Sequence, residues 1–215
     1  MKKAIIITML LITVFASSIE ANINDGQVVN LWNEITSATS LGGIPISIQH
    51  DGTPNAWVLN GNQVVVTTAL MSLLKTEAEM FGVLAHEAGH IKHGHYQEKV
   101  TSAVTINIVG GLLGAAFGGK GYDQLLHTAV DLGTGLGNAG VSRECEVEAD
   151  DFAVDLAFQL DKNPWGIHSA IHRFIAHGGK IQPSGFNSHP PDDRRLLRIS
   201  NRIHERDSST VIPEL

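Results

Sequence analysis

The sequence predicts an α+β domain that is mostly helical and carries a small antiparallel sheet. Three short runs, at 44–48, 55–59 and 64–66, have the alternating or β-branched apolar character of strands. The turn sequences Asp51-Gly52 and Asn60-Gly61-Asn62 separate them. Much of the remaining chain places apolar residues at helical spacing. The length of 215 residues, with 43% hydrophobic and 17% charged residues, suits one globular core.

The first residues predict export. Met1-Lys2-Lys3 is a basic start and residues 4–16 are almost purely apolar, which is the pattern of a secretory signal peptide. We expect a signal peptide at 1–18, with cleavage after Ser18 or as late as residue 21, and a periplasmic or secreted protein. The alternative is an uncleaved N-terminal membrane anchor, but the apolar run is shorter than the roughly 20 residues of a spanning helix.

Charge and cysteine content argue against nucleic-acid binding and against an intramolecular disulfide. The formal net charge is -7 at pH 7 and the basic residues do not cluster, so nucleic acid is not expected as a partner. Cys145 is the only cysteine, and an intramolecular disulfide is therefore impossible.

The first half of the domain is expected to begin with a helix over 24–40, followed by the three strands as an antiparallel meander. A short helix starts near Thr67 and leads into a longer one. Thr76 and Glu79 have the spacing of a capping box, so the longer helix should begin at Glu77. Apolar residues fill most of its positions, as in a helix that is buried on most sides.

The segment that follows is apolar and rich in glycine. Residues 103–118 contain Gly110-Gly111 and Gly114, and they are too few and too interrupted to span a bilayer. We expect a helix packed closely against its neighbours. The alternative is a flap that makes peripheral membrane contact through 103–118.

Three helices are expected in the last third of the chain. The first begins near Ser142, continues to Leu160 and is stopped by Pro164. The second covers 165–177, and the third covers 192–204 with an acidic first turn. The predicted domain therefore extends from residue 22 to residue 206, and 207–215 form a loose C-terminal tail.

The helix that begins at Glu77 carries His86-Glu87-Ala88-Gly89-His90, an H-E-x-x-H pattern. Residues four apart on an α-helix share one face, so His86 and His90 can bind one metal ion. Glu87 can hold and deprotonate a water on that metal, as in zinc peptidases. The pattern also arises by chance on amphipathic helices. Apolar surroundings favour the metal reading, because buried His and Glu side chains are costly unless they are satisfied.

A zinc site of this kind needs a third protein ligand. The pattern with a third histidine six positions on fails, because that position is Tyr96. The remaining candidates are Glu144, Glu146 and Glu148. Glu146 is favoured because the small Ala149 lets its helix approach closely, and Asp150 on the same face can accept a hydrogen bond from a ligand imidazole. The alternative is that these acids only complement a helix N-terminus.

Three motifs carry a resemblance to a known family. They are His86-Glu87-Ala88-Gly89-His90, Ser142-Arg143 followed by Glu146 and Ala149-Asp150, and Ser188-His189-Pro190-Pro191 with Arg195. In their order and gaps they resemble the motifs of the HtpX-like and CAAX-prenyl-protease-like zinc metallopeptidases, family forty-eight of the metallopeptidases. The integral-membrane members carry several spanning helices around the metal helix, so this chain is more similar to the small soluble periplasmic members.

The resemblance implies a gluzincin-type zinc peptidase domain with one Zn²⁺ per chain. In this reading His86, His90 and Glu146 hold the metal and Glu87 is the general base. The resemblance also implies a role for His189, which either donates a hydrogen bond to the oxyanion or occupies the open zinc position in a resting enzyme.

Further residues are expected to support this chemistry. Asp150 and Arg195 should lie behind the ligands, and Ala56, Trp57 and Val58 should form the edge strand that pairs with an extended substrate. The expected function is a zinc-dependent endopeptidase of the cell envelope that hydrolyses misfolded or extended polypeptides in protein quality control. The alternative is a chaperone-like binding module with a metal site and little proteolysis.

The other histidines match no ligand pattern. His93 is expected at the surface as a non-ligand, and His95 is expected to form a hydrogen bond within the fold. His168 and His172 share a helix face but have no Glu between them, so no second metal site is expected there.

Overall fold

The computed structural model describes residues 23–98, 100–101, 143–177, 189 and 193–213. The expected signal peptide at 1–18 and the segment 103–118 lie outside these residues. The elements in chain order are α1 (Asp25–Thr39), β1 (Ile46–Gln49), β2 (Ala56–Leu59), β3 (Gln63–Thr67), α2 (Thr68–Leu73), α3 (Glu77–Lys92), α6 (Arg143–Gln159), α7 (Gly166–His177) and α8 (Asp193–Arg206).

The mostly helical α+β class is confirmed, but the small sheet is mixed and not antiparallel throughout. Its order is β1-β3-β2, with β1 parallel and β2 antiparallel to the central β3. The tight turn at 60–62 makes β2 and β3 a hairpin, as expected. The loop at 50–55 instead crosses the end of β3, where Thr67 Oγ1 accepts a hydrogen bond from Asn55 N at 2.9 Å. The predicted antiparallel meander is wrong, because Asp51-Gly52 begins this longer loop across the end of β3 and does not form a second hairpin turn.

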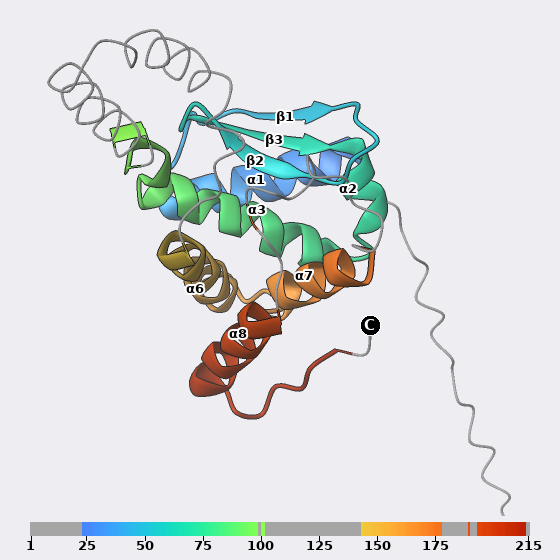
Figure 1. Cartoon of the computed structure of the whole chain (residues 1–215), viewed down its shortest axis with the longest axis vertical. Coiled ribbons are helices and arrows are strands. Elements are labelled where there is room, and N and C mark those ends of the chain that lie inside the picture. Colours follow the sequence, from blue (N-terminus) through green and yellow to red (C-terminus); the bar gives the residue numbers. More distant parts are fainter. Residues whose placement is uncertain (1–22, 99, 102–142, 178–188, 190–192, 214–215) are drawn as a thin grey trace, which may run out of the picture.

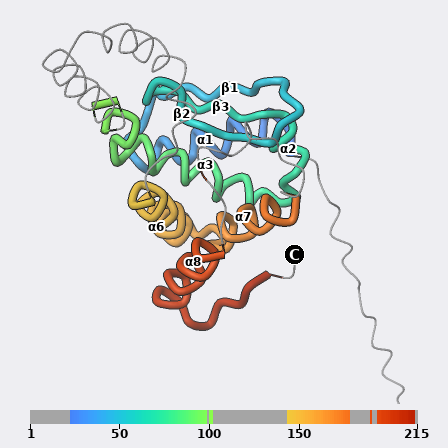
Figure 2. The backbone as a smooth tube through the Cα atoms, viewed as in Figure 1, coloured from blue at the N-terminus to red at the C-terminus, as the bar shows by residue number. Residues whose placement is uncertain are grey.

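The helices form layers on one side of the sheet. Helices α1 and α3 lie next to the sheet, α6 and α7 lie on the far side of α3, and α8 lies beyond them (Figures 1 and 2). Helix α3 contacts α1, α6, α7 and β2, so it is the centre of the packing. The side chains of residues 79–90 are accordingly all buried.

The start of α3 follows directly from its local sequence. Thr76 Oγ1 accepts a hydrogen bond from Glu79 N, and Glu79 Oε2 accepts one from Thr76 N, which confirms the predicted capping box. Glu79 is itself buried and pairs with Arg173 of α7. The cap therefore also joins the beginning of α3 to its neighbour.

Close contact between α3 and α7 depends on small residues. A Cβ atom built on Gly82 would lie 2.2 Å from the backbone nitrogen of Ile167, so no larger residue fits there without movement of a helix.

Among the described residues, none of the helices combines the length and the apolar character that a membrane span requires.

Candidate metal centre

Two imidazoles from successive turns of α3 form the base of the site. The Nε2 atoms of His86 and His90 are 3.0 Å apart, and both side chains are almost fully buried. Gly89 between them allows α6 to come close, because a Cβ atom on Gly89 would lie 3.0 Å from the Cα of Ala149. This small-residue contact sets the distance between the two helices and brings the carboxylates of α6 to the histidines.

Of the three candidate carboxylates, only Glu146 lies beside both histidines. Its Oε2 is 3.5 Å from His86 Nε2, and its Oε1 is 3.4 Å from His90 Nε2. Glu144 is exposed, and the Glu148 side chain, 56% exposed, points to His95. Of the three candidates, the structure therefore brings Glu146 alone into the group of buried donors.

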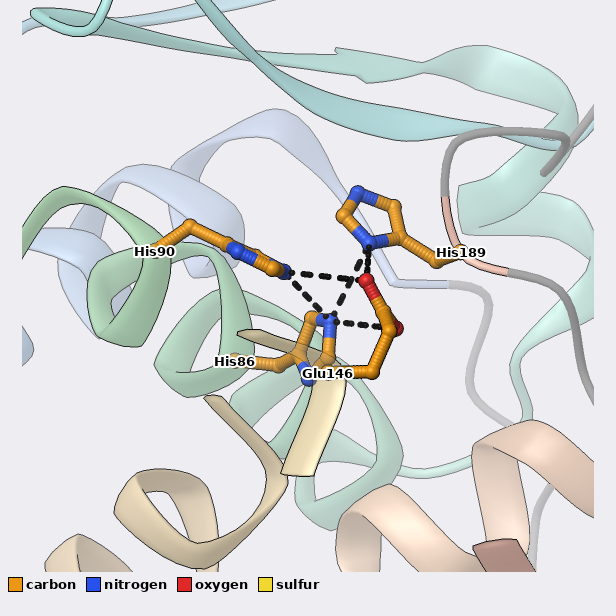
Figure 3. Close-up of side chains that lie close together, drawn as sticks. All are labelled: His86, His90, Glu146 and His189. Atoms are coloured by element: carbon orange, nitrogen blue, oxygen red, sulfur yellow. Dashed lines mark hydrogen bonds and ion pairs between the residues drawn. The ribbon is translucent and has the colours of Figure 1, made fainter. Parts of the chain in front are cut away.

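His189 joins this cluster from the far end of the chain. Its Nδ1 is 2.7 Å from Glu146 Oε1 and 3.3 Å from His86 Nε2. Figure 3 shows the four side chains pointing toward one another from α3, α6 and the segment that precedes α8. His86, His90, Glu146 and His189 are called the inner cluster below.

The inner cluster has the dimensions of a zinc site. Zinc bonds of about 2.0–2.1 Å in tetrahedral geometry place ligand atoms about 3.3 Å apart. The measured separations from 2.7 to 3.5 Å bracket this value, and one ligand atom from each residue lies within 4.8 Å of all the others. Three imidazoles and one carboxylate are also donors that zinc accepts. The residues therefore fit the ion.

Burial and neighbouring charges shift the protonation of the cluster. Burial acts to raise the pKa of Glu146, but the charge and hydrogen bond of His189, together with His90 and His86, outweigh it and hold that pKa far below its usual range. Burial is the main cause that lowers the pKa of His90. A charged carboxylate and a neutral imidazole are the forms that bind a metal.

Asp150 and Arg195, the residues predicted to support the ligands, lie directly behind the inner cluster. His86 Nδ1 lies 2.9 Å from Asp150 Oδ1. Arg195 donates from Nη2 and Nε to both oxygens of Asp150, at 2.7 and 3.1 Å, and its Nη1 lies 3.0 Å from Glu146 Oε2. Burial acts to raise the pKa of Asp150, but the charge and hydrogen bonds of Arg195, together with His86, outweigh it and keep that pKa low. One guanidinium thus fixes a ligand and the group that orients another.

His90 has a corresponding partner that the sequence did not identify. Its Nδ1 lies 2.8 Å from Nδ1 of His95, whose Nε2 lies 3.0 Å from Glu148 Oε2. His95 was expected only to bond somewhere within the fold. Helix α3 ends at Lys92, and Gly94 with φ of +71° turns the chain so that His95 returns to His90. Helical spacing could not reveal this contact, because His95 lies beyond the end of α3. The sequence feature that points to it is Gly94, which permits the turn.

Glu87 is buried beside the inner cluster. Its side chain is fully buried, and neither carboxylate oxygen has a hydrogen-bond partner among the described residues. Nε2 of the His189 ring lies 3.5 Å from Glu87 Oε1. A buried carboxylate in this state is costly and rare in native structures, and it indicates a functional role.

The expected substrate strand is an edge of the sheet. Strand β2 pairs with β3 on one side, and no described residue pairs with its other side. Ala56 is buried, whereas Trp57 and Val58 are half-buried. Since β2 also contacts α3, its open edge lies on the same side of the molecule as the metal helix.

Comparison with known proteins places these residues in a family context. The model of peptidase family M48 matches residues 22–203. The chain is 32% identical to the metalloprotease YcaL of Escherichia coli (strain K12) over 69% of the chain and 58% of YcaL. It is 27% identical to a protease HtpX homolog of Desulfatibacillum aliphaticivorans over 89% of the chain and 74% of the relative.

A eukaryotic relative extends the comparison. The mitochondrial metalloendopeptidase OMA1 of Schizosaccharomyces pombe is 30% identical over 74% of the chain and 47% of its own length. The chain thus spans less than two thirds of YcaL and about half of OMA1.

Proposed function

The chain belongs to peptidase family M48, and on this basis we propose that it is a zinc-dependent endopeptidase. The single observation that carries the proposal is Glu87, a buried carboxylate that no described residue hydrogen-bonds and that lies beside two histidines and a glutamate arranged for a metal. A purely structural metal site would not need such a base. The proposal rests on the site and on the family together, because fold alone does not define an activity.

The proposed roles follow from the geometry. His86, His90 and Glu146 hold one Zn²⁺, and when bound, the ion supplies the Lewis acidity that activates water and polarises the scissile carbonyl. Glu87 accepts the proton of the attacking water and delivers it to the leaving amine. The carboxylate of Asp150, 2.9 Å from Nδ1 of His86, favours a proton on that nitrogen, so that Nε2 of the same ring is left to face the metal.

We assign His189 to the resting state. Its Nδ1 lies at the fourth corner of the inner cluster, within 3.3 Å of His86 Nε2 and 2.7 Å of Glu146 Oε1. A residue in this position closes the site to water and substrate until it moves away. The role as an oxyanion donor is the competing assignment.

The open edge of β2 supports an extended polypeptide as the substrate. A peptide that adds to this edge would use the backbone of Ala56, Trp57 and Val58, and such pairing depends little on side chains. We therefore propose misfolded or extended proteins as the substrates and quality control in the cell envelope as the role. Export rests on residues 1–18, and mass spectrometry of the exported protein should find a new N-terminus after residue 18 or 21.

Cleavage of an unfolded protein tests the activity. We expect hydrolysis of reduced, carboxymethylated casein that stops with a chelator and returns with Zn²⁺. Glu87→Gln should retain the zinc but lose about 10² to 10⁴ in rate, because the amide cannot accept a proton. If Glu87→Gln cleaves at the wild-type rate, Glu87 is not the base. If the loaded wild-type protein binds casein without cleaving it, the protein is a metal-containing binding module instead.

A further inference from the structure

A second group of metal-binding side chains lies outside the inner cluster. It consists of His93, His95 and Glu148, which we call the outer cluster. One ligand atom from each lies within 4.8 Å of the other two, with His95 Nε2 at 3.0 Å and His93 Nδ1 at 3.8 Å from Glu148 Oε2. We propose that the outer cluster binds a second divalent transition-metal ion, and that this ion inhibits the peptidase. The inhibitory part rests on the proposed function.

The donors of the outer cluster select the kind of ion. Two imidazoles and one carboxylate suit Zn²⁺ or Cu²⁺ and disfavour Mg²⁺ and Ca²⁺, which prefer oxygen ligands. The rings of His93 and His95 lie almost parallel, at 15°, with their centroids 5.5 Å apart. The side chains of His93 and Glu148 are 40% and 56% exposed, so an ion can enter from solvent and keep water in its remaining positions.

His95 connects the two clusters, and its tautomer is determined by His90. Nε2 of His90 belongs to the inner cluster, so the ring proton of His90 is on Nδ1 and is donated to His95 Nδ1 at 2.8 Å. His95 must then carry its own proton on Nε2, where it is donated to Glu148 Oε2. Every polar atom along this path is satisfied by one arrangement of protons.

An ion in the outer cluster needs the opposite tautomer of His95. A metal bonds to an unprotonated ring nitrogen, so the proton on His95 Nε2 has to move to Nδ1. Nδ1 would then face the N–H of His90 at 2.8 Å, where two donors cannot bond. The outer ion therefore removes the hydrogen bond that orients His90. Loss of such a supporting bond typically costs about 10- to 100-fold in metal affinity or activity.

The number of bound ions tests the outer cluster independently of activity. Zinc titration of the inactive Glu87→Gln protein by calorimetry should show two ions per chain, with the second bound more weakly. His93→Ala in this background should bind one ion. Glu148→Gln should also bind one ion. Its amide oxygen can still accept the hydrogen bond from His95, so loss of the second ion in this variant would not be explained by misfolding. His50→Gln changes an exposed histidine outside both clusters and should still bind two. Two ions on both His93→Ala and Glu148→Gln would overturn the proposal.

NMR of the histidine nitrogens and activity measurements test whether an ion in the outer cluster changes the His95 tautomer and inhibits the peptidase. In Glu87→Gln, long-range ¹H–¹⁵N spectra should place the His95 proton on Nε2 at one equivalent of ZnCl₂ and on Nδ1 at excess. An unchanged tautomer would contradict the mechanism. In the active protein, the cleavage rate at excess ZnCl₂ should be about 10-fold or more below the rate at one equivalent, so the ratio of the two rates should be about 0.1 or less. The same ratio should fall in His50→Gln and stay near one in His93→Ala. Equal inhibition of both variants would also overturn the proposal, whereas a wild-type protein without peptidase activity would refute only the proposed function.

Discussion

Three of the four members of the inner cluster have a second contact that orients them. Asp150 lies beside Nδ1 of His86, and His95 lies beside Nδ1 of His90. Arg195 pairs with the carboxylate of Glu146. These contacts orient the nitrogen or oxygen that each residue would present to a metal ion. Such preorganisation concentrates the effect of a mutation on metal binding rather than on folding.

The first residue-scale prediction concerns Glu146. Glu146→Ala should reduce zinc affinity by more than the roughly 10- to 100-fold typical of a lost supporting contact, because a ligand itself is removed. Glu144→Ala is the matched control, since Glu144 lies on the same helix and is exposed. Metal analysis after dialysis against one equivalent of Zn²⁺ measures both. Full occupancy of Glu146→Ala would move the third ligand to Glu144 or Glu148.

The second residue-scale prediction separates the two roles of His189. If His189 closes the zinc site at rest, His189→Ala should retain zinc and raise kcat for an unfolded protein substrate. If instead it donates to the oxyanion, kcat should fall by about 10² to 10³. The geometry of the inner cluster favours the rise. A rate equal to that of the wild type would reject both roles.

At the scale of elements, the close contacts of α3 determine where the ligands lie. Gly82→Ala should destabilise the fold by about 1–3 kcal/mol, because the new methyl group would overlap the backbone of α7 at Ile167. Urea unfolding measures the free energy of unfolding. Gly52→Ala is the control, since a Cβ atom there would have no neighbour within 4 Å. An equal and small effect of the two changes would show that α3 and α7 adjust freely.

The sequence predicted the elements whose signals are local. Thr76 and Glu79 located the start of α3, and the four-residue spacing of His86 and His90 predicted the close approach of their Nε2 atoms. Two features could not be derived in this way. The parallel pairing of β1 with β3 depends on hydrogen bonds between residues 50–55 and Thr67, and the contact of His95 with His90 depends on the backbone turn at Gly94. Both arise from chain geometry and not from a side-chain pattern.

At the scale of the whole molecule, stability should depend on pH through His168. Burial, with the like charge of His172, lowers the pKa of His168 to about 4. Between pH 6.5 and 4 the unfolded chain therefore binds a proton that the folded chain does not, so the free energy of unfolding decreases as the pH falls through this window.

A substitution isolates this contribution. His168→Leu should lose less stability than the parent between pH 7 and pH 5, as measured by urea midpoints of the metal-free Glu87→Gln protein. His172→Gln keeps the buried histidine and should retain most of the pH dependence. The same decrease in His168→Leu and the parent would assign the acid sensitivity to other groups.

The inner cluster draws on positions far apart in the chain, since His86 and His189 are separated by 103 residues. Along the chain, His86, Glu87 and His90 come first, Glu146 follows, and His189 comes 43 residues after Glu146. Without Glu146, the metal helix lacks its carboxylate ligand. Arg195, which holds Glu146 and Asp150, comes later still. The inner cluster therefore forms only after segments from both halves of the domain have folded together, so a peptide of α3 alone would lack two of its four members.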